Sequence, residues 1–359
     1  MRRAADGALP LIAFVASMAL LIGLLALLGY DASVILTALW EGSMGSPSAL
    51  STSLGQAVPI ILTAAAFWLT VSAGVFNIGM DGQLQLGGLA TLLVAFALVG
   101  VLPALLVIVV GVAAGALAGA LWSALAGVPK ITRGTNEIVS TLMLNFVAFV
   151  IVGEMMRGAL QSETNRLTPQ TDKIDESLHI TSTIGGAQFS WGIVIAIAFT
   201  VALLGIVLMT SLGLRLRAIG LNAEAARHAA IPIPRYWHGV FLCAGALSGI
   251  AGALVILGLR FHIAPGWAPL WGFQGVLVTF LALRRPWLIP LWGVLFGMLA
   301  AAGPALKGSA SVPDSIVTVM ITLPVIVLYL LYALQREPLS WLPRLRAAGP
   351  SRAAEAQDG

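Results

Sequence analysis

Long stretches with almost no charged side chain recur along this 359-residue sequence, and they constrain its fold more than any other feature. A helix needs about 20 mostly apolar residues to cross the ~30 Å hydrocarbon core of a bilayer. That window predicts ten membrane-spanning helices, over residues 9–29, 50–72, 78–100, 103–126, 136–156, 190–210, 236–258, 270–283, 286–303 and 314–335. The eighth is short for a crossing, and the third begins inside a polar motif. We therefore expect an all-α polytopic membrane protein.

The composition supports this assignment. Hydrophobic residues make up 59% of the chain and charged residues only 9%, whereas roughly a quarter of the residues in a soluble domain are charged. The 39 glycines fit close packing between membrane helices. The single cysteine, Cys243, excludes a disulfide framework and a multi-cysteine metal site. We expect it to be a buried, inert thiol, because it lies in an apolar run.

The positions of the basic residues orient the chain. Ten crossings with a cytoplasmic N-terminus place 14 of the 19 lysines and arginines inside, which agrees with the positive-inside rule. Both termini are then cytoplasmic. The inside residues are Arg2, Arg3, Lys130, Arg133, Arg215, Arg217, Arg227, Arg235, Arg284, Arg285, Arg336, Arg344, Arg346 and Arg352. The outside residues are Arg157, Arg166, Lys173, Arg260 and Lys307.

The sequence predicts one transmembrane domain, residues 1–336, and a disordered cytoplasmic tail, residues 337–359. The outside loop 157–190 is long enough for a small structured cap, and 213–235 is an inside loop. The sequence contains no G-x-x-x-x-G-K-[ST] motif, and no segment can hold a nucleotide-binding domain. Any ATP-driven step therefore requires another chain.

A short sequence echo indicates a possible inverted repeat. Phe76-Asn77-Ile78 resembles Phe261-His262-Ile263, and each tripeptide follows a Gly/Ala-rich span. The topology places the first tripeptide inside and the second outside. Interrupted segments at corresponding positions of inverted halves are typical of transport pathways. Breaks that contain glycine or proline are also common at the ends of membrane helices, so both interpretations stay open.

The first polar motif, "FNIGMDGQLQLGG", runs from Phe76 to Gly88. Its glycines interrupt any helical stripe and allow a non-helical turn or close backbone approach. Backbone of this kind is tolerated at membrane depth only inside protein or beside a water-filled cavity. The motif fits a break that lines a solute pathway and, equally, a cytoplasmic turn with an aspartate at a helix N-terminus. The candidate pathway residues are Asn77, Asp81, Gln83 and Gln85.

The second motif, "GTNEIVSTLMLNF", opens the span at 136–156. Thr135 or Asn136 can cap the helix, and Glu137 suits its first turn. Four polar residues continue on one face at helical spacing: Glu137, Ser140, Thr141 and Asn145. Asn145 lies about 12 Å past Glu137, near the middle of the membrane. Its amide needs partners there, which predicts either contact between helices or contact with a solute.

The third motif, "GLRLRAIGLNAEAARHAAIPIPRY", is too polar to span. "NAEAARHAA" predicts a short helix with Asn222 as N-cap and Glu224 in its first turn. Pro232 disfavours helix at Ile231 and closes the element. The motif fits an amphipathic helix at the membrane surface, or a docking element for a cytoplasmic partner.

Together the three motifs resemble the permease subunits of bacterial ABC importers for nucleosides and simple sugars, within the ribose/branched-chain amino acid permease group. The resemblance covers roughly residues 50–335. It implies a multi-pass protein of the bacterial cytoplasmic (inner) membrane that pairs with a second permease, a cytoplasmic ATP-binding subunit and an extracytoplasmic solute-binding protein. It places Gly220, Asn222, Glu224, Ala225, Ala226 and Arg227 in the region that couples to the ATPase. It also places the first motif and the helix from Asn136 to Asn145 on the binding side.

Two other functions remain open at this stage. A stand-alone secondary transporter would need an ion site, for which Asp81, Glu137 and Glu154 are the plausible carboxylates. A membrane anchor without transport would need neither. The four histidines are scattered, and no metalloprotease or nucleophile-elbow motif is present, so we expect a transport subunit with no catalytic centre, no cofactor, no metal site and no nucleic-acid partner.

Overall fold

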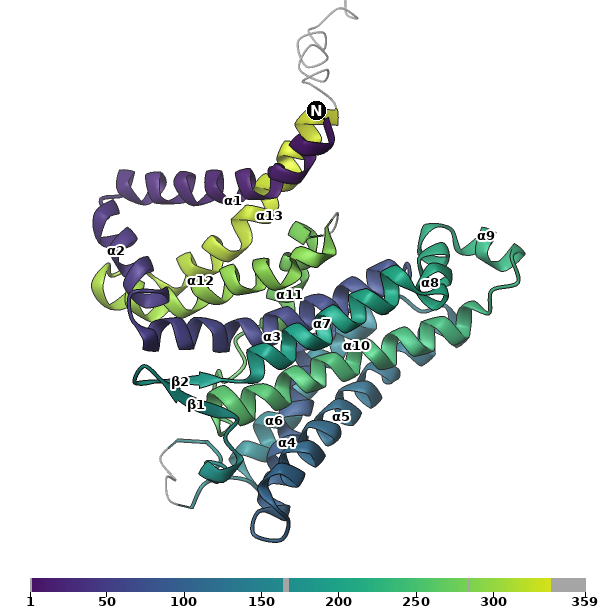
Figure 1. Ribbon diagram of the computed structural model, residues 1–359, viewed down its shortest axis with the longest axis horizontal. Coiled ribbons are helices and arrows are strands. Elements are labelled where there is room, and N and C mark those ends of the chain that lie inside the picture. Colours follow the sequence, from purple (N-terminus) through teal and green to yellow (C-terminus); the bar gives the residue numbers. More distant parts are fainter. Residues whose placement is uncertain (1, 164–167, 283–284, 337–359) are drawn as a thin grey trace, which may run out of the picture.

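The computed structural model describes residues 2–163, 168–282 and 285–336 (Figure 1). Within these ranges nine helices are long and apolar enough to cross a membrane. The α-helices are α1 Arg2–Leu27, α2 Ala32–Ser43, α3 Pro47–Ser72, α4 Met80–Leu98, α5 Ala104–Arg133, α6 Glu137–Arg157, α7 Gly192–Met209, α8 Ser211–Leu221, α9 Ala223–His228, α10 Ile233–Val255, α11 Trp271–Ala282, α12 Ile289–Ser309 and α13 Asp314–Arg336. The short elements are η1 Glu176–Leu178, β1 Thr181–Ile184, β2 Ala187–Ser190, the π-helical turn η2 Ile256–Arg260 and η3 Pro286–Leu288.

Helices α3 and α10 form the centre of the molecule and are the most deeply buried of the long helices (Figure 1). The start of α3 contacts the β1–β2 hairpin, through Ser51 and Gln188. The π-helical turn at the end of α10 contacts Ile180, directly before the hairpin. The start of α3 and the end of α10 therefore lie at the same end of the molecule, and the two helices are antiparallel. Glycine allows α10 to approach α5 closely. A Cβ added to Gly249 would lie only 2.0 Å from the carbonyl oxygen of Gly115. Close approach of this kind is a common mode of helix packing in membranes.

The two helices that follow each central helix in the sequence pack on the other central helix. Helices α4 and α5 pack on α10, whereas α11 and α12 pack on α3. Each central helix is also followed by a non-helical break and a returning helix, at 73–79 before α4 and at 261–270 before α11. This arrangement is what an inverted repeat would produce, and it places the two breaks at opposite ends of the central pair.

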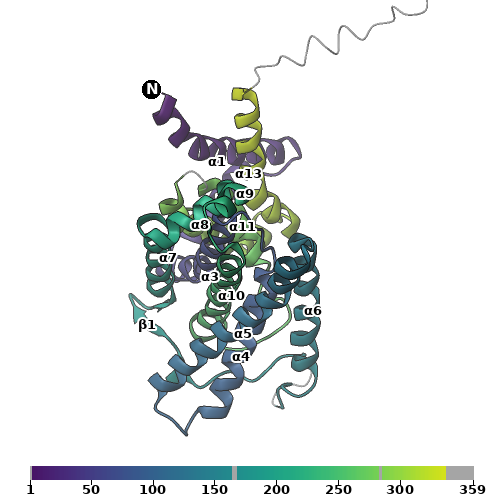
Figure 2. The same ribbon diagram turned by 90° about the vertical axis from the view of Figure 1, so that its right-hand side faces the viewer.

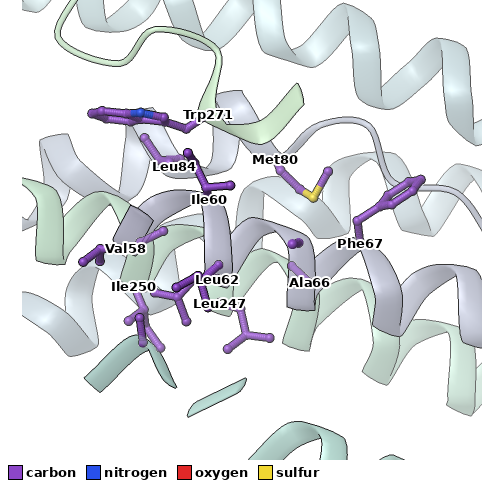
Figure 3. Close-up of a cluster of buried hydrophobic side chains, with 14 of the residues drawn as sticks. Val58, Ile60, Leu62, Ala66, Phe67, Met80, Leu84, Leu247, Ile250 and Trp271 are labelled. Carbon is purple, nitrogen blue, oxygen red and sulfur yellow. The ribbon is translucent and has the colours of Figure 1, made fainter. Parts of the chain in front are cut away.

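Figure 3 shows the apolar core where α3, α4, α10 and α11 meet. The labelled side chains are Val58, Ile60, Leu62, Ala66, Phe67, Met80, Leu84, Leu247, Ile250 and Trp271. Lipid tails are as apolar as these side chains, so burial from lipid supplies little driving force. The dense contacts between well-fitted surfaces therefore hold the crossing together.

The second break has an irregular backbone. The π-helical turn η2 ends at Phe261, whose φ is 63°, and Leu270 has a φ of 55°. Left-handed conformations are uncommon for residues other than glycine. The outside loop fastens this segment, because Thr171 donates its N–H to the Ile263 carbonyl at 3.0 Å and Ile174 donates to the Phe261 carbonyl at 2.9 Å.

The two ends of the molecule carry different small elements. The outside loop, described except for residues 164–167, contains an antiparallel hairpin in which Thr181 pairs with Ser190 and Ile184 with Ala187. This hairpin and the helices α8 and α9 lie at opposite ends (Figure 1). The first residues of α1 and the last of α13 lie at one side, as Figures 1 and 2 both show.

Several predicted bounds need correction. The span predicted for 103–126 belongs to a helix that continues to Arg133, because a helix need not end where the membrane does. Two helices were not predicted: α2 is too short for the hydropathy window, and α8 is too polar. The eighth span, α11, has only 12 residues and rises about 18 Å. Cys243 is exposed on α10 rather than buried. The predicted tail lies outside the described residues.

Candidate functional site

The first break is held by buried amides that hydrogen-bond to each other. Asn77 Nδ2 donates to Gln83 Oε1 at 3.2 Å, and Gln83 Nε2 donates to Asn77 Oδ1 at 3.0 Å. Asn77 Oδ1 also accepts the Gly79 N–H at 2.9 Å, and Asn77 Nδ2 donates to Ser123 Oγ of α5 at 3.3 Å. Asn77 and Ser123 are fully buried, and Gln83 is 1% exposed. Protein groups thus satisfy the polar atoms of the break, as membrane depth requires.

Helix α6 supplies the remaining partners of this backbone. Thr141 Oγ1 accepts the Ile78 N–H at 3.1 Å and donates to the Glu137 carbonyl at 2.7 Å. Asn145 Oδ1 accepts the Gly82 N–H at 2.8 Å, and its Nδ2 donates to the Ile78 carbonyl at 2.9 Å. The polar face of α6 predicted from the sequence therefore binds the first break, which is the helix-contact alternative for Thr141 and Asn145.

Asp81 joins the two returning helices. It lies in the first turn of α4, a position that fits one of the two alternatives left open by the sequence, and it is 2% exposed. Its Oδ1 accepts the Gly272 N–H at 2.8 Å and its Oδ2 accepts the Phe273 N–H at 3.2 Å, both in the first turn of α11. A carboxylate is favourable there because it meets the positive end of the helix dipole. Gly272 permits the approach, since an added Cβ would lie 2.8 Å from the Asp81 carboxyl carbon.

Close backbone approach, one of the two roles predicted for the glycines of the first motif, is found inside α4. The helix is regular from Met80 onward, so only residues 73–79 are non-helical. Gly87 and Gly88 are instead places of close contact. An added Cβ would lie 2.4 Å from Gly249 Cα at the first position and 2.4 Å from Trp267 Cη2 at the second.

The other candidate residues lie apart from this network. Glu137 forms an ion pair with Lys130 at 2.9 Å near the inner end of α6. Among the described residues, Ser140 Oγ donates only to the Glu137 carbonyl of its own helix, at 3.3 Å. Gln85 is half-buried, lines a small cavity beside Trp267, and makes no hydrogen bond to any residue in the described ranges.

Sequence reasoning missed Ser123, Gly272 and Phe273. Ser123 could have been found as a small polar residue within an otherwise apolar span. The two residues of α11 contribute backbone N–H groups, which leave no mark in the sequence.

The segment α8–α9 carries the residues predicted to couple to an ATPase. Asn222 caps α9, because its Oδ1 accepts the Ala225 N–H at 3.0 Å. Ala226 is buried against Ile219 and Ile233. Glu224 and Arg227 are exposed and pair at 2.8 Å. An exposed pair of this kind adds little stability, so these charges are available to a partner.

The junction of α8 and α9 and the start of α10 both contact the chain where α3 ends and the first break begins. Gly220 packs on the end of α3, where an added Cβ would lie 2.2 Å from the Ser72 carbonyl oxygen. Trp237, early in α10, donates its Nε1–H to the Ala73 carbonyl at 3.1 Å. Movement of α8–α9 would therefore act directly on residues 73–79.

Comparison with known protein families shows which family this chain belongs to. The family described as "Branched-chain amino acid transport system / permease component" matches residues 49–332, well over half of the chain. The chain belongs to this family. It is therefore a multi-pass membrane permease component of a transport system, a class that works with an ATP-binding subunit and a substrate-binding protein and that lies in the inner membrane of bacteria.

Three relatives span most of the chain. The guanosine ABC transporter permease protein NupP of Bacillus subtilis is 26% identical over 332 residues, which cover 91% of this chain and 94% of the relative. The nucleoside ABC transporter permease protein NupB of Lactococcus lactis is 28% identical over 319 residues, 87% of each chain. The glucose ABC transporter permease protein TsgB13 of Haloferax volcanii is 29% identical over 299 residues, 80% of this chain and 77% of the relative.

Proposed function

We propose that this chain is one of two paired permease subunits of an ATP-driven importer and that it forms part of the pathway for a nucleoside or a simple sugar. The relatives named for guanosine, nucleosides and glucose support this substrate class. The chain has no ATPase site of its own. The energy comes from a separate cytoplasmic subunit, and a soluble protein outside the membrane delivers the solute. The second permease is expected to be a different chain, as the resemblance to nucleoside systems implies.

The observation that carries the proposal is the connection between α8–α9 and the first break. The exposed face of this segment includes Asn222, Glu224 and Arg227. The segment is fixed to the protein through Ala226 on its buried face and through Gly220 at the end of α8, and Trp237 joins the start of α10, which follows it, to Ala73. A rigid element with an exposed polar face suits a partner that binds and releases during each ATP cycle.

The first break can transmit that movement. Residues 73–79 lie directly between the α8–α9 contact and the bonds to Asn145 and Asp81. Hinge movement is absorbed by a few residues at element ends, whereas packed helices move as bodies. We infer that, when the ATPase engages, movement of α8–α9 passes through residues 73–79 to α4 and, through Asp81, to α11.

The three candidate carboxylates argue against a stand-alone secondary transporter. Asp81 accepts two backbone N–H groups of α11. Glu137 pairs with Lys130, and Glu154 is exposed and pairs with Arg157 at 3.3 Å. All three carboxylates therefore already have partners within the described residues, which disfavours a coupling-ion site built from them.

Reversing the charge at Glu224 tests the proposal. Glu224→Arg replaces the acidic partner of Arg227 by a second arginine on the docking face. We expect at least a tenfold loss of the ATP-binding subunit that co-purifies with the permease, and a matching loss of ATP-driven uptake, because like charges across an interface are strongly unfavourable.

Arg133→Glu is the matched control. Arg133 is also exposed at the inner end of its helix but lies outside α8–α9. It should leave both measurements unchanged. Normal docking and uptake by the Glu224→Arg protein would refute the coupling role of this segment.

A further inference from the structure

A groove of about 420 Å³ lies between α7, α8 and α10. We call it the Arg235–Cys243 groove, after the first and last residues that α10 contributes to it. The last turns of α7 and the first turns of α10 form its walls, and α8 lines its inner end (Figure 1). Apart from Arg235, Tyr236 and Cys243, the residues of its lining are aliphatic or glycine.

The groove opens sideways from the helix bundle. Its base is buried, since Leu69 of α3 is 3% exposed. At its rim Ile206 of α7 and Leu212 of α8 are 49% and 52% exposed, and Cys243 is exposed as well. Because α7 and α10 cross the membrane, the medium beside this rim is lipid.

The length of the groove matches one leaflet of the bilayer. Arg235, Gly239 and Cys243 follow each other at intervals of four residues, so they lie along one face of α10. The helix rises about 12 Å over these eight residues. Half of the hydrocarbon core is about 15 Å thick. The groove therefore runs from the inner surface of the membrane to near its midplane, which is the depth of one acyl chain.

Positive charge gathers at the inner end of the groove. Residues 210–238 contain one acidic residue, Glu224, and four arginines: Arg215, Arg217, Arg227 and Arg235. Glu224 pairs with Arg227. The other three arginines form no ion pair with a carboxylate in the part of the chain that the structure describes. An anion is therefore needed to balance their charge.

These three arginines lie close to the groove. Arg235 belongs to its lining, and Arg215 and Arg217 are the neighbours of Leu216, which also lines it. Arg217 donates from Nη2 to the Leu208 carbonyl at 3.3 Å, which keeps its guanidinium beside the inner end of α7. An apolar cleft one leaflet deep thus ends in a cluster of cations at the membrane surface.

We propose that the Arg235–Cys243 groove binds one anionic phospholipid of the inner leaflet. One acyl chain lies along α10 from Arg235 to Cys243, and the phosphate meets Arg235, with the charges of Arg215 and Arg217 nearby. Basic pockets between membrane helices on the cytoplasmic side favour lipids of this charge, and a guanidinium can bind a phosphate through two N–H groups. Because α8 begins the segment α8–α9, the lipid would hold this segment against α7 and α10.

A lipid fits the groove better than the surface of another membrane helix does. Protein interfaces in membranes are closely packed, as protein interiors are. A helix laid across the rim would leave the base at Leu69 unfilled, whereas an acyl chain can enter the groove along its length. The arginines at its inner end also have no use for an apolar helix.

Lipid titration of the purified importer gives the first test, and it needs neither ATP nor solute. The complex is stripped of lipid in detergent and titrated with dioleoylphosphatidylglycerol or dioleoylphosphatidylcholine, and bound lipid is counted by native mass spectrometry. We expect one phosphatidylglycerol to bind at least tenfold more tightly than phosphatidylcholine. Arg235→Gln should weaken phosphatidylglycerol binding about fivefold, the usual effect of one basic side chain near an anionic lipid surface, and Arg235→Lys should keep most of the wild-type affinity.

Arg133→Gln is the matched control for charge. Arg133 is exposed in the last turn of α5 and does not line the groove. Its substitution should leave the affinity for phosphatidylglycerol unchanged. Equal affinities of the wild-type protein for the two lipids, or equal losses in Arg133→Gln and Arg235→Gln, would overturn the proposal.

Filling the groove tests its shape. No atom lies within 4 Å of a Cβ added to Gly239, so Gly239→Leu can extend into the groove without a clash. It should weaken phosphatidylglycerol binding at least fivefold. Gly205→Leu on α7 also meets no atom within 4 Å but lies outside the lining, and it should bind the lipid normally. If Gly239→Leu binds the lipid normally and instead loses the second permease from the complex, the groove is a protein interface and the proposal is wrong.

The single thiol of the chain provides a second test. Phosphatidylglycerol should slow the reaction of Cys243 with N-ethylmaleimide several-fold, followed as the mass of this chain, and phosphatidylcholine at the same concentration should slow it much less. In a Cys243→Ala parent, an Ile184→Cys thiol on the exposed hairpin should react at the same rate with either lipid. Equal rates at Cys243 with the two lipids would contradict the proposal.

Discussion

At the residue scale, Asn145 supplies the hydrogen-bond partners of two backbone groups, one in the first break and one in the first turn of α4. Its amide accepts the Gly82 N–H and donates to the Ile78 carbonyl. Asn145→Leu removes both bonds and leaves two buried backbone groups unpaired, at about 1–3 kcal/mol each. We expect the variant to lose about 2–5 kcal/mol of unfolding free energy, measured by denaturation in detergent micelles.

Ser140→Ala on the same helix serves as the control for Asn145. Its hydroxyl bonds only within α6, so its loss should cost less than about 0.5 kcal/mol. A stable Asn145→Leu protein that has lost uptake would instead show that Asn145 contacts the solute.

The contacts between residues of different helices could not be predicted from the sequence. Polar residues at helical spacing identified the buried face that carries Thr141 and Asn145. Their partners lie more than 60 residues away in the chain, and the partners of Asp81 are backbone groups 191 and 192 residues away. Hydropathy and local spacing report on neighbours along one helix, so contacts between helices remained invisible.

At the element scale, the short helix α11 depends on close contact with α4. Gly272→Ala places a Cβ about 2.7–2.8 Å from the Asp81 backbone nitrogen and carboxyl group. The two helices must then separate, which weakens the two hydrogen bonds at the start of α11. We expect a loss of about 1–3 kcal/mol in unfolding free energy, as is typical of overpacking, together with reduced uptake.

Gly205→Ala on α7 provides the comparison for this substitution. No atom lies within 4 Å of the added Cβ there. The change should be neutral or should stabilise the protein by less than about 1 kcal/mol, because alanine is the better helix former. Equal effects of the two substitutions would contradict the packing argument.

Element lengths were largely predictable, and the exceptions have physical causes. The starts and ends of most spans lie within about three residues of the structure, because a crossing fixes both length and polarity. Helix α5 continues for seven residues past its predicted end, through Lys130 to Arg133. There the chain leaves the apolar region while its helical hydrogen bonds continue. The amphipathic helix α8 has no continuous apolar run from which it could be predicted.

At the scale of the whole molecule, the account predicts a fixed orientation in the membrane. Leu221, the last residue of α8, is 88% exposed, and Ile184, in the hairpin, is 54% exposed. Single cysteines at these sites in a Cys243→Ala parent should react with an impermeant maleimide from opposite sides: Leu221→Cys only from the cytoplasmic side and Ile184→Cys only from outside. Reaction of both from one side would contradict the inverted arrangement of the two breaks.

The central claim is that ATP hydrolysis by a separate subunit drives solute through this chain, and that α8–α9 couples the two. Reconstitution of the permease pair with its ATP-binding subunit and binding protein in liposomes tests this directly. We predict guanosine or D-glucose uptake that requires ATP, persists when ion gradients are collapsed, and falls at least tenfold with Glu224→Arg but not with Arg133→Glu. Uptake that follows an ion gradient in the absence of ATP would contradict the account.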